Sequence, residues 1–194
     1  MRGRRRFTQA ISEGERISLL AEVADADTAG AAEAGGAEGL VVGAMVDGLR
    51  AATELPILWR GRDARPDDAV AAGADASVLA VEGFEDEDGR LERLHADALE
   101  RGLDSVVAVR DEDELRLALD RLDPEVFLLL GRAARDADGL EHVLSLLSDV
   151  PAGKLAIAEL DVPEPDDVAE LERAGIDAVI VAASRVAALS DAPR

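Results

Sequence analysis

The feature that most constrains the fold is the alternation of short apolar runs with helix-like segments, clearest in residues 55–81, LPILWRGRDARPDDAVAAGADASVLAV. The run LPILW is typical of a buried strand, and a polar loop follows it. Pro66 and Asp67 favour the first turn of a helix, and Gly73 favours its end. The run ASVLAV is then a second buried strand. Two nearly all-apolar strands joined by a helix predict a right-handed βαβ unit in a parallel sheet.

This unit recurs along the whole chain. The expected strands span residues 17–23, 37–42, 55–59, 76–81, 104–109, 125–130, 154–158 and 178–181. A helix-like segment follows nearly every strand, although the link at 43–54 is short for a full helix. Eight βα units predict a (β/α)₈ TIM barrel, and because such barrels usually have about 250 residues, its loops must be trimmed. The alternative is an open doubly wound sheet, which would place a glycine-rich turn after the first strand, where AEVADAD stands.

The chain reads as one domain. With no linker or low-complexity stretch, we expect a single barrel over residues 17–190, preceded by a basic arm at 1–16 whose first residues, MRGRRRF, are solvated. The arm lacks the apolar core of a secretory signal, and no apolar run reaches the ~18 residues of a membrane span.

The net charge and the lack of cysteine limit which partners the protein can bind and in which cell compartment we expect it. The net charge of -21, from 42 acidic and 21 basic residues, repels nucleic acid. The absence of cysteine excludes disulfides and thiolate metal sites, and it fits a cytoplasmic protein. Lys154 is the sole lysine. Many acids with almost no lysine favour an organism of high internal salt, although a GC-rich genome would also replace lysine by arginine. We expect a monomer or homodimer that uses no cofactor and no metal.

Several segments together resemble one family. They are Glu22 in LLAEV, LPILWR, AGADASVLAV, the helix start DEDELRLAL, AIAELDVPEPDDVAEL and AGIDAVIVAAS. Their order is similar to that in indole-3-glycerol-phosphate synthase, a ribulose-phosphate-binding type of barrel, over residues 17–186. The resemblance implies a (β/α)₈ enzyme of tryptophan biosynthesis, a carboxy-lyase that closes the indole ring with loss of carbon dioxide and water. This chain would be a divergent and shortened relative.

The first half of the chain departs from the family pattern where the resemblance implies proton-transfer groups. A lysine should follow Glu22 by two residues, but Ala24 stands there. The family has a lysine at the end of the third strand that acts as general acid, and this chain has Arg60 there. The family has a catalytic glutamate on the fifth strand, and this chain has Ala108 there. Arginine stays protonated at any working pH and cannot give up a proton during turnover.

The second half departs in the same way. The sixth strand of the family ends in a pair of asparagines, and this chain has Leu130 and Gly131 at those positions. Arg132 matches the arginine that follows them in the family. Glu159 is kept, but the serine and glycine after it are Leu160 and Asp161. The Gly-Glu-Ser phosphate turn after the eighth strand reads Ala182, Ala183, Ser184. The phosphate grip that the resemblance implies is therefore weakened.

Strand parity predicts a group of charged side chains at the barrel mouth. The resemblance implies that Glu22, Arg60 and Glu159 point inward. Because residues two apart on a strand share a face, Arg110 and Arg132 should then also point inward and meet Arg60 near the carboxyl ends of the strands. With Ser184 they are the candidate ligand-binding residues, because guanidinium forks suit a phosphate or carboxylate. The alternative is that the arginines pair with Glu22, Glu159 and Asp161 and plug the mouth. Glu22 and Glu159 are the candidate catalytic residues, as an acid or a base.

Three functions stay open at this point. The first is a family member with most catalytic residues replaced, inactive or altered in the indole-forming reaction, that binds a small phosphorylated or carboxylate ligand. The second is a working lyase in which arginines substitute for the lysines. The third is a structural or regulatory subunit with a filled barrel.

Overall fold

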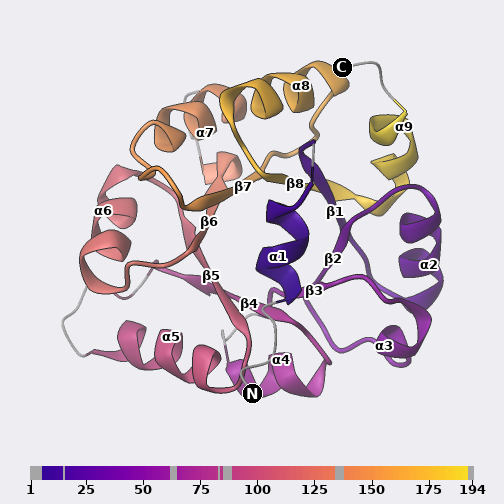
Figure 1. Ribbon diagram of the computed structural model, residues 1–194, viewed down its shortest axis with the longest axis horizontal. Coiled ribbons are helices and arrows are strands. Elements are labelled where there is room, and N and C mark those ends of the chain that lie inside the picture. The colour runs from indigo at the N-terminus through magenta and orange to yellow at the C-terminus, as the bar shows by residue number, and fades with distance from the viewer. Residues whose placement is uncertain are drawn as a thin grey trace.

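The computed structural model describes residues 6–14, 16–61, 65–82, 84, 89–133 and 138–191. Its strands form a closed parallel barrel in chain order, which confirms the predicted (β/α)₈ fold (Figure 1). The strands are β1 (Ser18–Glu22), β2 (Gly39–Val42), β3 (Ile57–Trp59), β4 (Ala76–Ala80), β5 (Asp104–Val109), β6 (Val126–Leu130), β7 (Leu155–Glu159) and β8 (Ala178–Ala182).

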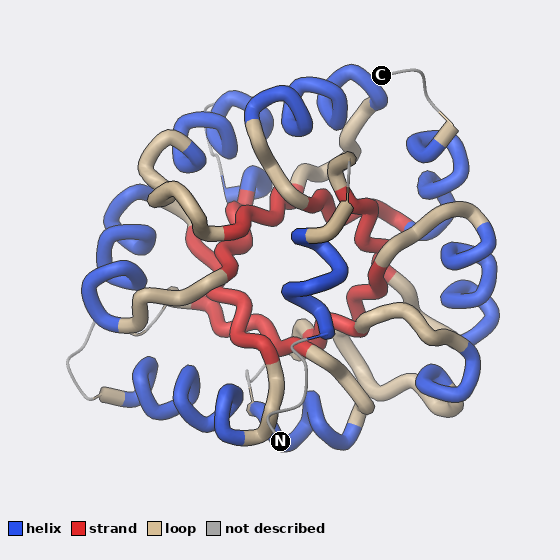
Figure 2. Tube along the Cα trace, in the orientation of Figure 1, coloured by secondary structure: helices blue, strands red, loops and turns tan. Residues whose placement is uncertain are grey.

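Helices surround this barrel, as the tube in Figure 2 shows. They are α2 (Ala26–Ala34), α3 (Leu49–Ala52), α4 (Pro66–Ala71), α5 (Arg90–Glu100), α6 (Glu112–Arg121), α7 (Gly139–Leu147), α8 (Pro165–Ala174) and α9 (Val186–Ser190). Short 3₁₀ turns, η1 (Gly131–Ala133) and η2 (Ala183–Arg185), follow β6 and β8. The link at 43–54, expected to be short for a helix, holds only the single turn α3. No helix in the described ranges is long and apolar enough to cross a membrane.

Two apolar layers follow from the period-2 alternation of the strands. Leu20, Val41 and Leu58 belong to the cluster that fills the barrel interior. Their chain neighbours, such as Ala21 and Leu40, belong to the cluster between the strands and the surrounding helices. Because both faces of every strand are covered, the strands are almost wholly apolar, which is why the sequence pattern identified them.

The amino-terminal segment is a structural part of the barrel. Helix α1 (Arg6–Ser12) lies within the ring of strands in Figure 2, at the end where the strands begin. Phe7 is 0% exposed and Ile11 is 3% exposed, and both join the interior cluster. The backbone N–H of Thr8 donates to Asp104 Oδ2 at 2.8 Å. The prediction of a solvated basic start is therefore wrong at Phe7, because Phe7 and Ile11 share one helix face and close the barrel floor. Residues 1–5 of that prediction lie outside the described residues.

Two aspartates hold neighbouring strands at that same end. In the turn AGAD, Asp75 Oδ2 accepts from the N–H of Ile57 at 2.9 Å, and Asp75 N–H donates to Ile57 O at 2.8 Å. In AGID, Asp177 Oδ2 accepts from the N–H of Ala156 at 2.8 Å, and Asp177 N–H donates to Ala156 O at 2.9 Å. The two turns thus make the same clamp in opposite halves of the barrel. Burial raises the pKa of Asp177, with the hydrogen bond from Ala156 opposing the shift.

Asp177→Asn is expected to stabilise the fold increasingly as pH rises. A carboxyl group whose folded pKa is raised contributes stability below its ordinary pKa of 3.8 and loses that contribution as pH rises through the folded pKa. Asparagine keeps an acceptor for the Ala156 N–H without the buried charge. Chemical denaturation from acid to neutral pH measures the difference. A variant that is increasingly less stable than the parent with rising pH would contradict this account. Asp75→Asn is the control, and because it removes an ion pair with Arg50 at 3.6 Å, we expect it to destabilise at neutral pH.

Candidate functional site

The centre of the barrel mouth holds a bidentate ion pair. Arg60 directly follows β3 and Glu159 ends β7, two strands that lie opposite each other in the ring. Arg60 Nη1 donates to Glu159 Oε1 at 2.5 Å, and Nη2 donates to Oε2 at 2.8 Å. The Glu159 side chain is 1% exposed and that of Arg60 is 30% exposed. The pair therefore spans the mouth from one side to the other and places a buried carboxylate at its floor.

Arg132 in η1 approaches the same carboxylate from another side. Its Nε lies 3.4 Å from Glu159 Oε1 and 3.3 Å from Asp161 Oδ1. Its side chain is 42% exposed, and it makes no hydrogen bond with any residue in the described ranges. Arg60 and Arg132 thus converge on Glu159 as parity predicted, but only Arg60 is tightly bound. The donors of Arg132 remain available to a ligand.

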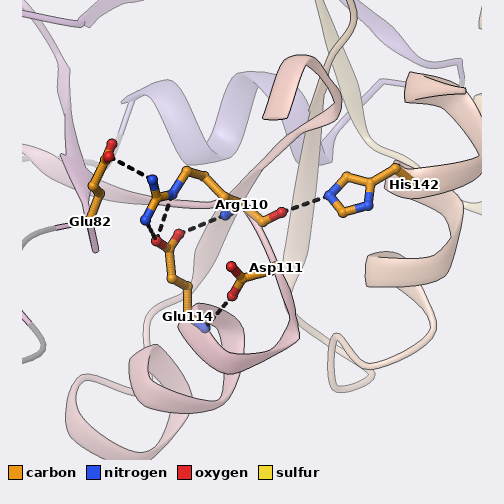
Figure 3. Close-up of polar contacts among 5 residues, drawn as sticks. All are labelled: Glu82, Arg110, Asp111, Glu114 and His142. Carbon is orange, nitrogen blue, oxygen red and sulfur yellow. Dashed lines mark hydrogen bonds and ion pairs between the residues drawn. The ribbon is translucent and has the colours of Figure 1, made fainter. Parts of the chain in front are cut away.

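Arg110 has other partners (Figure 3). It forms ion pairs with Glu82 at 2.6 Å and with Glu114, which is nearly buried. The second oxygen of Glu114 accepts from the backbone N–H of Arg110 at 2.7 Å. The hydrogen bond with Glu114 raises the pKa of the Arg110 guanidinium. His142 on α7 donates from Nε2 to the Arg110 carbonyl oxygen at 2.6 Å. These contacts assign Arg110 to the junction of β5, α6 and α7, and not to the group around Glu159.

The remaining predicted residues lie at the rim. Glu22 at the end of β1 is exposed, and its side chain has no polar partner among the described residues. Ser184 in η2 is exposed, and its neighbour Arg185 pairs with Glu164 at 3.4 Å. Glu22 and Ser184 therefore edge the mouth without entering the ion-pair group.

The only lysine lies at the opposite end of the barrel. Lys154 precedes β7, and its Nζ donates to Asp123 Oδ1 at 2.7 Å. Asp123 has a left-handed φ of 46°, and the ion pair holds this turn between α6 and β6. In a (β/α)₈ barrel, chemistry takes place at the carboxyl ends of the strands, so Lys154 cannot contribute to it. The described part of the mouth contains guanidinium and carboxylate groups but no amine.

A cavity of about 360 Å³ opens beside Arg132, and sequence reasoning did not identify it. Its walls come from η1, the start of α7, the segment between β7 and α8, and the first turn of α8. Gly131 makes this junction possible, because a Cβ there would lie 2.7 Å from Leu160 Cδ2, 2.8 Å from Gly139 O and 2.9 Å from Glu159 O. The only signal in the sequence was this glycine directly after a buried strand.

The partner of Arg110 was also missed, although it had a readable signal. Glu114 lies four residues after Arg110, a spacing that favours ion pairs on helices. Asp111 lies between them and caps α6, accepting from the Glu114 N–H at 2.9 Å. The helix start DEDE thus explains why Arg110 is held away from the centre.

Comparison with known proteins identifies the same relationship that the sequence segments suggested. Residues 63–191 match the family described as indole-3-glycerol phosphate synthase. The indole-3-glycerol phosphate synthase of a Nocardioides strain is 36% identical over 180 residues, which cover 84% of this chain and 67% of that protein. The corresponding synthase of Salinibacter ruber is 32% identical over 118 residues, covering 59% of this chain and 42% of the relative. That of Sulfurisphaera tokodaii is 30% identical over 135 residues, covering 66% and 52%.

The chain thus spans about two thirds of the first of these relatives and about half of the other two. Among solved structures, a mandelate oxidase variant with an FMN adduct matches with a TM-score of 0.63 at 18% identity. The match covers 90% of this chain and 67% of that one. This likeness concerns the barrel fold alone.

Proposed function

The chain belongs to the indole-3-glycerol phosphate synthase family, and from this premise we propose that it is a binding protein that has lost the indole-forming reaction. Its ligand is a small carboxylate held at the barrel mouth by Arg132. The observation that carries the proposal is the contrast at Glu159, where Arg60 is tightly bound and Arg132 is only loosely engaged.

The loss of catalysis follows from the groups at the mouth. The family resemblance implies lysines at two positions, which here are Ala24 and Arg60. A guanidinium cannot exchange a proton at working pH, and Arg60 is also held by both oxygens of Glu159. Removing one positioned proton donor costs about 10²–10⁴ in rate, so several such losses remove useful turnover.

The charges around Arg132 favour a carboxylate over a phosphate. Asp161 lies 3.3 Å from Arg132, and the neighbouring cavity is also lined by Asp138 and Asp167. A phosphate dianion would bring two negative charges close to these aspartates, and no lysine lies there to compensate the second charge. A monocarboxylate needs only one guanidinium fork, and Arg132 presents donors that suit one.

Thermal unfolding with added ligands tests this function. We expect 4-methylpentanoate to raise the midpoint of unfolding in a concentration-dependent manner, because it binds the folded state alone, and inorganic phosphate at equal ionic strength to raise it less. Arg132→Gln should abolish the effect. Arg116→Gln is the matched control, since Arg116 is 65% exposed and pairs with Asp113 on α6, and it should leave the effect unchanged. An equal midpoint with and without the carboxylate, or an undiminished rise in Arg132→Gln, would contradict the proposal.

A further inference from the structure

We propose that the cavity beside Arg132 binds an α-amino acid with an apolar side chain. The inference rests on the proposed function, because Arg132 would hold the carboxylate of the amino acid. It goes further by assigning the other two groups of the ligand, the ammonium and the side chain, to particular walls of the cavity.

The position of the cavity allows Arg132 to serve it. Arg132 lines the cavity of about 360 Å³ and also contacts Glu159 at the mouth. Its ion pairs with Glu159 and Asp161 are longer than 3.2 Å, so the guanidinium is oriented without being saturated. A volume of this size lies at the lower end of the range for small-molecule sites.

Three carboxylates line the same cavity, and each retains acceptor capacity. Asp138 Oδ1 accepts from the N–H of Leu140 at 3.0 Å, and Asp167 Oδ2 accepts from the N–H of Glu164 at 2.7 Å. Asp161 contacts Arg132 through Oδ1 and is 82% exposed. The second oxygen of each group has no hydrogen bond to any other described residue. An ammonium group has three donors to offer such oxygens.

The sum of these charges favours a carboxylate that also carries a positive group over a carboxylate alone. Among the described residues that line the cavity, Arg132 and the three aspartates sum to a formal charge of -2. A ligand with a carboxylate alone gains one ion pair and meets three repulsive charges. A zwitterion satisfies both signs at once. A bare metal ion does not fit either, because no group of three acidic, histidine or cysteine side chains within the described ranges is close enough to hold one.

The remaining wall is apolar. Leu140, Leu160 and Val162 line the cavity together with the aspartates. Leu160 is 6% exposed and forms a floor, whereas Val162 is 59% exposed at the rim and is one of the few large apolar side chains open to solvent. Covering Val162 with an aliphatic ligand group would remove this apolar surface from water. The combination of guanidinium, carboxylates and apolar wall matches the three groups of an apolar amino acid.

Isothermal titration calorimetry with three probes that share one branched aliphatic group tests the inference by comparing their affinities. The probes are L-leucine, 4-methylpentanoate, which lacks the ammonium, and 3-methylbutylamine, which lacks the carboxylate. We expect L-leucine to bind at least about tenfold more tightly than either, equivalent to one charge-assisted contact of about 1.4 kcal/mol. Arg132→Gln should reduce L-leucine binding to the level of the amine.

Asp138→Asn is the most informative variant on the acidic side. Asparagine caps helices as well as aspartate does, so α7 keeps its N-cap while the cavity loses one charge. We expect it to weaken L-leucine binding several-fold and to strengthen 4-methylpentanoate binding. Asp25→Asn makes the same exchange at the N-cap of α2, away from the cavity, and should change neither affinity.

The outcomes separate the inference from the proposed function. Equal affinity for L-leucine and 4-methylpentanoate, with loss of both in Arg132→Gln, would overturn the amino-acid inference and leave the carboxylate site standing. No binding of any probe, or binding that Arg132→Gln does not alter, would overturn both. Binding of the amine as tightly as L-leucine would overturn the assigned role of Arg132.

Discussion

Arg60→Leu is expected to lower the free energy of unfolding by about 3 kcal/mol, because it leaves the buried carboxylate of Glu159 without its bidentate partner. Glu159 is 1% exposed, so water cannot replace the lost donors. Its remaining contact, with Arg132, is 3.4 Å long. The estimate lies at the lower end for a broken buried pair because the Arg60 side chain is itself 30% exposed. Urea denaturation at neutral pH measures the change.

A double variant distinguishes the cost of an unpaired charge from a general loss of packing. Arg60→Leu with Glu159→Leu removes both charges, and we expect it to recover most of the stability that Arg60→Leu loses. Arg116→Leu breaks the exposed pair with Asp113 and should cost less than about 1 kcal/mol. If Arg60→Leu cost no more than Arg116→Leu, the internal ion pair would not be the feature that fills the mouth.

Phe7→Ala is expected to lower the free energy of unfolding by about 3 kcal/mol or more, an effect expected of a fully buried phenylalanine. Phe7 is 0% exposed and packs into the interior cluster from the side where the strands begin. Its removal would leave a cavity at the barrel floor. Thermal and urea unfolding should both report the loss.

Phe84→Ala is the matched control for this prediction. Phe84 is only partly buried and stacks under the Arg90 guanidinium, whose Cζ lies 5.4 Å from the ring centroid. Such a contact contributes about 0.5–1 kcal/mol at an exposed site. Equal and small losses in both variants would mean that α1 is a dispensable arm and not the floor of the barrel.

The fold could be predicted because it depends on patterns that repeat. Each strand is buried on both faces and so appears as a continuous apolar run, and helix signals such as Pro66 and Gly175 mark the segments between them. The family resemblance placed Arg60 and Glu159 inside the mouth, and strand parity then correctly placed Arg132 with them.

Strand parity gave a wrong prediction where nearby carboxylates compete for an arginine side chain. Arg110 has the inward parity of Val106 and Ala108, yet Glu114 and Glu82 bind it at the side of the mouth. The many arginines near the amino terminus favoured a solvated arm, so the four-residue spacing of Phe7 and Ile11 was not used as a signal. That spacing puts both side chains on the face of α1 that packs into the barrel floor. The cavity beside Arg132 depends on how the ends of β6 and β7 approach α7 around Gly131, and sequence spacing does not contain that information.

Formation of indole-3-glycerol phosphate from its open-chain precursor tests the central claim most directly. The assay is run at high protein concentration, at both low and molar salt, with the Nocardioides synthase measured in parallel as a positive control. Because Arg60 stands where the family resemblance implies a proton-donating lysine, and it is bound by Glu159, we expect a rate below about 10⁻⁴ of that control under every condition. Turnover within tenfold of the control would show that Arg60 and its neighbours support the chemistry, and it would contradict the account.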